Sequence, residues 1–372
     1  MATKYFSLSN LSNGMKEQEK TIAQALSQLG LYKLYSSIGK TNTVEAFANF
    51  DYEQKNELAL NSLMKYCAEY AGIGSDVEAL KSPATRRDKD FSKKFFGILQ
   101  VATAPVIAEV VNQAFDYIAE VRNAGWGDSF LFRVGSPALF QVNLLARGIN
   151  RGAAQRIYDE NITLVPTNRE VTVSMDWYQV AAGRYDMGDY LFRVGRSFAA
   201  DMSQMAYNSL DATFANLPSP LKYSGAFATE TLDAMVQRLQ ALNGQSIYGF
   251  GSLGALSQVL PSNDYLKIPL AEEWDTLGYV GQYHRIRFML IEQNMVPSTI
   301  GTSMDFGVSQ NRIYLMPMAS EKPMKVGIEG NTMVYETDAE TSADNTIFVT
   351  TQMSYGAVLA TANRYGIYEI TA

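Results

Sequence analysis

The alternation of hydrophobic and polar positions predicts two strands near the middle of the chain. Residues 129–134 read Ser-Phe-Leu-Phe-Arg-Val, and residues 171–177 place Val, Val, Met and Trp at every second position. A period of two is typical of a strand with one buried face. More than thirty residues that fit neither a tight turn nor a helix separate the two patterns. We interpret the whole segment as a long hairpin that extends away from the body.

Such a hairpin needs a surface to lie on. Two strands form no core of their own and are marginally stable in water. An exposed strand edge also invites pairing with another chain. The simplest support is a neighbouring copy of the same chain, so this segment predicts a protein that self-associates.

A long amphipathic helix follows the second strand pattern. Over residues 187–215 the apolar positions recur at spacings of three and four, which indicates a helix with one buried face. Asp186 is the expected N-cap, and Asp189 lies in the first turn, where the helix dipole favours a carboxylate. Pro218 and Pro220 end the helix. At about 1.5 Å per residue it would be roughly 40 Å long, enough to act as a spine.

Further periodic segments predict helices before the hairpin and mostly short strands after the spine. Gly30 is expected to close the first helix, Pro105 to lie in the first turn of the third, and a late hairpin to turn at residues 329–332. The expected helices cover residues 21–29, 53–70, 105–121 and 229–242, and the expected strands 283–291, 312–316, 324–336 and 345–370. This mixture predicts an α+β fold.

Composition and charge narrow the possible roles. The net charge of −7 over 372 residues gives no support for strong non-specific binding of nucleic acid over the whole surface. The basic run at residues 81–94 is interpreted as a solvated or subunit-facing surface, with contact to a genome as the alternative. A single cysteine, Cys67, excludes an internal disulfide, and the N-terminus lacks the apolar core of a signal peptide. Polar residues interrupt the apolar stretch 95–115, which indicates a buried element and not a membrane span.

A glycine pattern at residues 249–254, Gly-Phe-Gly-Ser-Leu-Gly, matches the dinucleotide-binding motif. That motif requires a preceding strand, a helix that opens on it and an acidic residue about 20 residues later. Pro261 leaves room for two helical turns, and Glu272 and Glu273 follow Pro269 in a polar surround. We interpret the segment as a glycine-rich turn and keep a nucleotide-binding enzyme as an alternative. No catalytic, cofactor or metal residues are assigned, and we expect a protein that is not an enzyme and has no cofactor.

In the order of its parts the chain resembles the major capsid proteins of tailed bacteriophages, which share the HK97-like fold. The most specific likenesses are the Gly-Tyr-Val-Gly turn at residues 278–281 leading into a strand, and a closing segment that carries Arg364 and Gly366. The resemblance covers roughly residues 95–372. It implies an N-terminal arm (1–94), the first part of a peripheral domain (95–126), an E-loop hairpin (127–182), a spine helix (183–217), an axial domain (218–344) and a peripheral return strand (345–372).

The resemblance implies a structural role. Copies of the chain would assemble into the hexamers and pentamers of an icosahedral phage head, in the capsid shell of a virion built in the host cytoplasm. The implied partners are further copies and a portal, with scaffolding and decoration proteins as additional candidates. The shell would enclose double-stranded DNA without sequence-specific binding, and no membrane is involved.

Two departures from the family matter. Some relatives join their subunits through an E-loop lysine, but this chain has no lysine in residues 95–221. The E-loop instead carries Arg147, Arg151 and Arg156, which are expected to contact acidic groups of neighbouring subunits. The long N-terminal region is either a cleaved scaffolding segment or a retained arm. An encapsulin-type nanocompartment shares the fold and is the alternative, although its subunits usually have a shorter N-terminal region.

Overall fold

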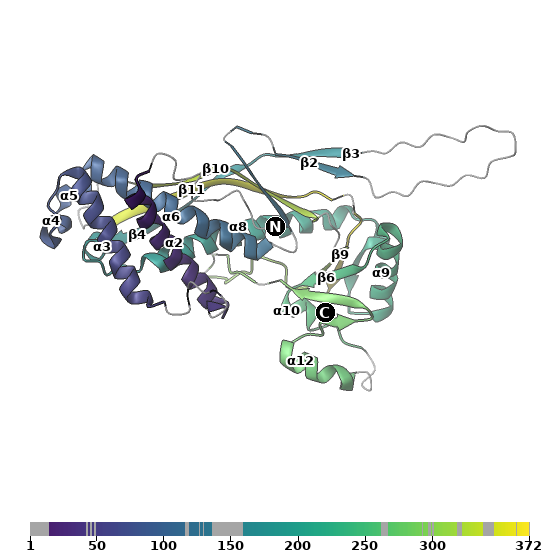
Figure 1. Cartoon of the computed structure of the whole chain (residues 1–372). Helices are drawn as coiled ribbons and strands as arrows, with labels where there is room; N and C mark the ends of the chain where they lie inside the picture. Colours follow the sequence, from purple (N-terminus) through teal and green to yellow (C-terminus); the bar gives the residue numbers. More distant parts are fainter. Residues whose placement is uncertain are drawn as a thin grey trace.

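Two β-sheets, each packed around a hydrophobic core, organise the described chain (Figure 1). The computed structural model describes residues 15–41, 44, 47, 50–115, 119–125, 127–128, 130–135, 159–261, 267–291, 293–296, 299, 301–317, 322–337, 346–361 and 363–371. The helices are α2 (Glu17–Ser37), α3 (Tyr52–Ala71), α4 (Val77–Lys81), α5 (Pro83–Arg87), α6 (Lys89–Phe115), α7 (Trp177–Ala181), α8 (Met187–Thr213), α9 (Thr229–Asn243), α10 (Leu253–Leu256) and α12 (Ala271–Leu277), with short 3-10 turns η4 (Phe214–Asn216), η5 (Ser219–Leu221) and η6 (Ile268–Leu270). The strands are β1 (Ala119–Ala124), β2 (Phe130–Gly135), β3 (Asp159–Leu164), β4 (Thr167–Asp176), β5 (Lys222–Gly225), β6 (Ile247–Gly251), β7 (Gln282–Tyr283), β8 (Ile286–Leu290), β9 (Arg312–Pro317), β10 (Met324–Thr337), β11 (Thr346–Leu359) and β12 (Gly366–Ile370). The predicted α+β fold is confirmed.

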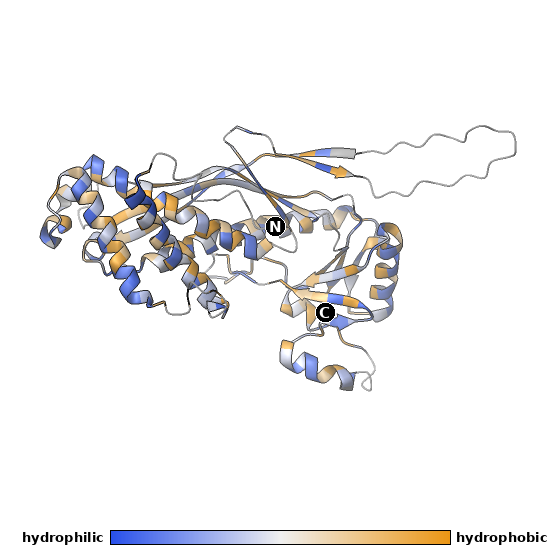
Figure 2. Cartoon of the chain, in the orientation of Figure 1, coloured by the Kyte–Doolittle hydropathy of each residue, from blue (hydrophilic) through white to orange (hydrophobic). Residues whose placement is uncertain are grey.

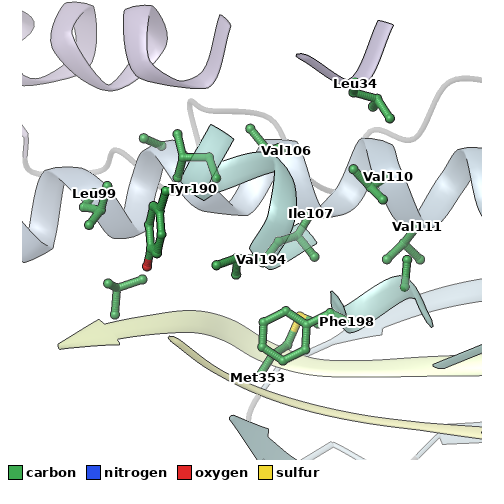
Figure 3. Packing of buried hydrophobic residues seen from close by; sticks show 14 of the residues in the cluster. Leu34, Leu99, Val106, Ile107, Val110, Val111, Tyr190, Val194, Phe198 and Met353 are labelled. Carbon is green, nitrogen blue, oxygen red and sulfur yellow. The ribbon is translucent and has the colours of Figure 1, made fainter. Parts of the chain in front are cut away.

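Strands β1, β10, β11 and β4 form a four-stranded sheet in that order. Along β11, Ile347 and Val349 are buried and Phe348 between them is exposed, so the alternation gives the sheet one apolar face. Helix α8 covers that face. The ring of Phe198 packs edge-on against Tyr355 of β11, with 5.9 Å between the ring centroids, and Figure 3 shows the same Phe198 beside Met353.

Helices α2, α3 and α6 pack with α8 over the four-stranded sheet and complete the main core. The side chains of Leu26, Leu60, Leu99 and Leu191, one from each helix, are fully buried. Figure 3 shows α6 lying beside α8 with Val106 and Ile107 at their contact. Helices α2 and α3, which the resemblance assigns to an N-terminal arm, therefore form part of the core.

The prediction that Gly30 ends the first helix is wrong, because α2 continues through it to Ser37. A Cβ atom at Gly30 would lie 2.9 Å from Val106 of α6 and 3.1 Å from Leu191 of α8. Real Cβ atoms do not approach neighbours that closely, so the glycine serves helix packing and not helix termination.

The helix predicted over residues 105–121 begins earlier and ends earlier. Helix α6 contains Pro105 in its interior, and Val121 lies in β1 instead. Lys89–Gln113 is the segment of the described chain that is long and apolar enough to span a membrane, but 72% of its most apolar window is buried. The interpretation of this stretch as a buried element is thus confirmed.

The spine helix is confirmed as α8, a helix of 27 residues. The Asp186 side chain caps it by accepting a hydrogen bond from the Asp189 backbone N–H at 2.9 Å. Asp186 also accepts a hydrogen bond from the Tyr52 hydroxyl and pairs with Lys33 at 3.0 Å. Burial acts to raise the Asp186 pKa, but these hydrogen bonds outweigh it and lower the pKa below its ordinary value.

The second sheet has the strand order β5-β12-β9-β6-β8-β7, and helix α9 packs on it around a smaller core. It joins the C-terminal end of α8 through a charged contact. Arg312 of β9 pairs with Asp211 of α8 at 3.0 Å and with Glu369 of β12 at 2.8 Å. Tyr314 donates a hydrogen bond to Asp211 at 2.7 Å, and burial and this carboxylate raise the Tyr314 pKa. The network connects the six-stranded sheet to the spine.

Strands β10 and β12 belong to different sheets. Strand β10, placed by the prediction in the axial domain, belongs to the four-stranded sheet, whereas β12, placed in the peripheral return strand, belongs to the six-stranded sheet.

The prediction that a hairpin turns at residues 329–332 is wrong. The pairing of β10 with β11 shifts register between Glu329 and Met333, and Gly330 has a φ of 67°, so this site is a β-bulge within one strand.

Candidate functional site

The hairpin arm consists of β2 and β3, paired antiparallel from Phe130 opposite Leu164 to Gly135 opposite Asp159. Figure 1 shows this pair extending along and beyond the four-stranded sheet. The first predicted strand is confirmed as β2, but the prediction that residues 171–177 form its partner is wrong. Those residues lie in β4 and the start of α7, and β4 pairs with β11, where Val173 lies opposite Val349. The alternating face of β4 therefore belongs to the four-stranded sheet and packs against the main core, with Val171 and Val173 half-buried and Met175 buried.

The base of the arm has a small core of its own. Phe130, Phe132 and Leu164 point to one side and are 3%, 0% and 8% exposed, while Leu131 on the other side is 50% exposed. Two strands alone could not bury such a face. Its burial shows that the base of the arm is fastened to the sheet beneath it.

Two glycines form the surface on which this core lies. Gly327 of β10 and Gly356 of β11 are directly paired across the sheet. A Cβ atom at Gly327 would meet Leu164 at 2.6 Å and Phe130 at 2.9 Å, and one at Gly356 would meet Leu164 at 3.1 Å. We call Gly327 and Gly356 the glycine seat. Because neither residue has a side chain, the apolar face of the hairpin lies directly against the backbone of the sheet.

A charged group closes one side of the seat. Lys325 of β10, whose side chain is 3% exposed, donates a hydrogen bond to Glu120 of β1 at 2.7 Å, and Arg122 pairs with the same carboxylate at 2.7 Å. Arg122 also donates to the carbonyl oxygen of Leu131 in β2 at 3.1 Å and lies 4.6 Å from the ring centroid of Phe132. These contacts join β1, β10 and the arm.

The ionisation of Glu120 depends on this arrangement. Partial burial acts to raise the pKa of its carboxyl group, but the hydrogen bonds and charges of Lys325 and Arg122 outweigh burial and lower the pKa below its ordinary value. Glu120 is therefore a carboxylate at neutral pH, and its negative charge offsets the positive charge of the buried Lys325.

Both ends of the arm are held by the same sheet. The chain enters the arm from β1 and leaves it into β4, and these strands are the two opposite edges of the sheet. At the entrance, Gly127 donates a backbone hydrogen bond to Glu329 of β10 at 2.8 Å. At the exit, the Thr167 hydroxyl donates to the Tyr355 carbonyl oxygen of β11 at 3.4 Å. The sheet thus sets both the position and the direction of the hairpin.

The three arginines predicted to contact neighbouring subunits, Arg147, Arg151 and Arg156, lie outside the described residues. They fall between Gly135 and Asp159, the last pair of the described hairpin.

The groups that fasten the arm to the sheet were not predicted from the sequence. A signal was present for some of them, since glycine in a strand often marks close approach of another segment. Nothing in the sequence indicated that Glu120 and Lys325 would meet.

The glycine pattern at residues 249–254 has a different environment from a nucleotide site. Gly249 and Gly251 lie within β6, and Cβ atoms there would meet Phe288 at 2.5 Å and Leu256 at 3.1 Å. Helix α10 has four residues, and Glu272 and Glu273 lie in helix α12, not at the end of a parallel strand. Side chains of the protein fill the space beside both glycines, so this geometry does not favour the nucleotide-binding alternative.

Comparison with known protein families finds no matching family, and comparison with curated proteins finds no match. Among solved structures the chain is similar to a chain of the capsid of a native GTA particle, with 13% identity, a TM-score of 0.47 and coverage of 71% of this chain and 91% of that one. It is also similar to a chain of Mycobacterium phage Bobi, with 14% identity, a TM-score of 0.47 and coverage of 71% and 90%. A virus-like particle from Pyrococcus furiosus gives 9% identity, a TM-score of 0.43 and coverage of 72% and 97%.

The three similar chains come from a capsid, a phage and a virus-like particle. The order of parts in this chain, an anchored hairpin, a long spine helix and a smaller sheet domain, is the order which that resemblance implies. Because all three TM-scores are below 0.5, the function proposed below takes its support from the geometry of this chain.

Proposed function

We propose that the chain is the major capsid subunit of a tailed, double-stranded DNA phage, and that its copies assemble into the hexamers and pentamers of an icosahedral head. The observation that supports this most is the anchored hairpin arm. The sheet fixes its base at both ends, and its apolar face is buried on the glycine seat. A hairpin with a base fixed so firmly suits an element that reaches a neighbouring copy.

The division into domains follows from the two cores. The four-stranded sheet with helices α2, α3, α6 and α8 would be the peripheral domain, and the six-stranded sheet with α9 would be the axial domain. The contact of Arg312 with Asp211 and Glu369 lies where the two meet. In a shell, this joint would hold the axial domain at a fixed angle to the spine.

The proposed partners are further copies of the chain and a portal, with scaffolding and decoration proteins as additional candidates. The net charge of −7 suits a wall that encloses DNA without binding its sequence. The shell would be assembled in the host cytoplasm and remain in the virion. Without an E-loop lysine, the contacts between subunits would be non-covalent, with Arg147, Arg151 and Arg156 facing acidic groups of neighbours.

Negative-stain electron microscopy with light scattering, on the purified protein, tests the proposal. Closed particles tens of nanometres across are the expected result, either alone or after co-expression with a scaffolding protein. A protein that stays monomeric or dimeric under both conditions would contradict it. Particles that enclose a host enzyme and no DNA would instead support the encapsulin-type alternative.

A further inference from the structure

Helix α12 projects from the six-stranded sheet domain without a buried residue of its own. Trp274 is 41% exposed and Leu277 is 47% exposed, and Leu253 of α10, which packs beside Gly278, is 47% exposed as well. Figure 2 shows hydrophobic and hydrophilic positions mixed along this helix. A helix of seven residues is not stable by itself in water. A cluster of large apolar side chains on such an element is typical of an interaction site.

The same helix is acidic. Glu272 and Asp275 are exposed on either side of Trp274, while Glu273 accepts a hydrogen bond from the Gly281 backbone at 3.2 Å. We call Leu253, Glu272, Trp274, Asp275 and Leu277 the α12 knob. Its chemistry, large apolar side chains together with carboxylates on one short helix, predicts a partner surface that is concave, partly apolar and basic.

The described part of the chain contains a surface of that kind. A hollow of about 340 Å³ lies between α9 and the η5–β5 segment. Its apolar walls come from Pro220, Tyr223 and Met235, and its cations are Lys222 and Arg238, with Glu230 as the one acidic residue of the lining. We call it the α9 hollow. A cavity of about 150 Å³ holds benzene, so the α9 hollow has room for an indole ring.

The charges of the α9 hollow are open to a partner. Lys222 donates a hydrogen bond to the carbonyl oxygen of Ala215 at 2.7 Å, which leaves its positive charge without a carboxylate partner in the described residues. Arg238 is exposed and has no hydrogen bond or ion pair within the described parts of the chain. Two cations against one glutamate give the hollow a net positive charge, opposite to the charge of the α12 knob.

The topology keeps the two surfaces apart within one copy. The α9 hollow includes Lys222 and Tyr223 of β5, one edge strand of the six-stranded sheet, whereas α12 leads directly into β7, the other edge strand. Figure 1 shows α9 and α12 on different sides of this domain. When two complementary patches lie on different sides of one molecule, their contact is head-to-tail, and repeated contacts close into a ring if the rotation allows.

We infer that the α12 knob of one copy inserts into the α9 hollow of the next, with Trp274 inside and Asp275 or Glu272 facing Arg238, and that this contact closes the ring of axial domains. The partner is a second copy of this chain. The inference rests on the proposed shell function and adds to it the pair of surfaces that define each ring.

Cross-linking of assembled particles tests this contact. The double variant Trp274→Cys with Ala234→Cys places one thiol on the knob and one in the hollow. The natural Cys67 is fully buried and stays unreactive in the folded protein. After treatment with a short bismaleimide, a denaturing gel should show a ladder of covalent oligomers that stops at the ring size. The matched control, Trp274→Cys with Leu242→Cys, uses a residue of α9 that is 50% exposed but lies outside the hollow, and should give no ladder.

Several outcomes would overturn the inference. Dimers formed by Trp274→Cys alone would show a symmetric knob-to-knob contact, and an equal ladder from the Leu242→Cys control would show non-specific reaction. Particles that the double variant forms but that give no cross-link would reject this contact and leave the shell function intact. If wild-type protein forms no particles at all, the proposed function fails, and the inference fails with it.

A charge exchange gives an independent readout. Arg238→Glu should raise the subunit concentration needed for assembly by at least about tenfold, because it puts like charges across the contact. Adding Asp275→Arg to Arg238→Glu should recover most of that loss. Both residues are exposed, so circular dichroism and thermal unfolding should stay unchanged. A loss that neither Asp275→Arg nor Glu272→Arg recovers would contradict the assigned contact.

Discussion

Gly327 and Gly356 fix the position of the arm because they lack side chains. Their Cα atoms face Leu164 and Phe130 at distances that leave no room for a methyl group. A larger residue would lift the hairpin from the sheet and open a gap around Phe132. The addition of one Cβ atom at either glycine would therefore disturb the contact between the arm and the sheet.

We expect Gly327→Ala to lower the free energy of unfolding by about 1–3 kcal/mol, through overpacking against Leu164 and Phe130. Chemical denaturation measures this. Gly97→Ala is the matched control, because a Cβ atom at Gly97 in α6 meets nothing within 4 Å. That substitution should raise the stability by about 0.5–1 kcal/mol, since alanine favours the helix. Equal effects of the two substitutions would contradict the role of the seat.

The carboxylate of Glu120 should make the free energy of unfolding depend on pH in the acid range. Its pKa is lower in the folded chain than the ordinary value of 4.5, so the unfolded chain binds more protons. The contribution of Glu120 is fully present above about pH 4.5 and is lost as the pH falls through the folded pKa. Glu120→Gln should remove this part of the acid dependence and cost about 1–3 kcal/mol at neutral pH, because Lys325 stays buried.

Urea titrations between pH 3 and pH 7 test this expectation. Glu17→Gln serves as the control, since the Glu17 side chain is 89% exposed and pairs only with Lys20 in the described structure. Its stability curve should follow that of the wild type within error. If Glu120→Gln loses as much stability at low pH as the wild type does, other carboxylates cause that loss.

At the scale of elements, α8 links both cores. Its first turn is held by Asp186, which also contacts α2 through Lys33 and α3 through Tyr52. Its last turn carries Asp211, which contacts the six-stranded sheet. The spine is therefore fastened at each end by one aspartate.

Asp186→Ala should cost about 2 kcal/mol, the upper end for an N-cap, because Tyr52 and Lys33 lose their partner along with the cap. Asp51→Ala on α3 removes a simpler cap, a single hydrogen bond from the Gln54 backbone at 3.3 Å, and should cost about 0.5–1 kcal/mol. Thermal unfolding compares the two. If both cost the same, the contacts of Asp186 beyond the cap contribute nothing measurable.

At the scale of the whole molecule, shortening the arm tests its role in assembly. Gly135 and Asp159 face each other across β2 and β3, so an Asn-Gly turn can replace residues 136–158. We expect the shortened protein to unfold at the same temperature as the wild type and to form no closed particles. Calorimetry and electron microscopy give the two readouts. Normal particles from the shortened protein would refute the role of the arm.

The arginines of the arm have a separate test. Replacing Arg147, Arg151 and Arg156 together by alanine should leave the folded subunit intact and weaken assembly, with the loss largest at low salt. Light scattering across a salt series measures this. Replacement by lysine keeps the charge but not the planar donor group, so it should restore part of the assembly. Full assembly of the alanine variant would show that these arginines do not hold the shell.

Much of the element pattern could be predicted from local periodicity. The helix α8 with its cap at Asp186, and the strand β2, follow from the spacing of apolar residues over short windows. Partners in the sheets could not be predicted this way. The alternation of residues 171–177 fits any apolar neighbour, and β11, nearly two hundred residues later, supplies it. The seat was missed for the same reason, because a glycine in a strand indicates a close approach but not which segment approaches.

The pentapeptide Leu-Phe-Arg-Val-Gly occurs twice, and its local sequence does not determine its conformation. At residues 131–135 it lies in strand β2, with Phe132 buried on the arm, and at residues 191–195 it lies in helix α8, with Leu191 and Val194 buried. The sequence by itself determined the flanking periods and the helix cap at Asp186. Only the tertiary structure decided which side chains are buried and against what. Burial of an apolar face stabilises either conformation, and the surface available nearby selects between them.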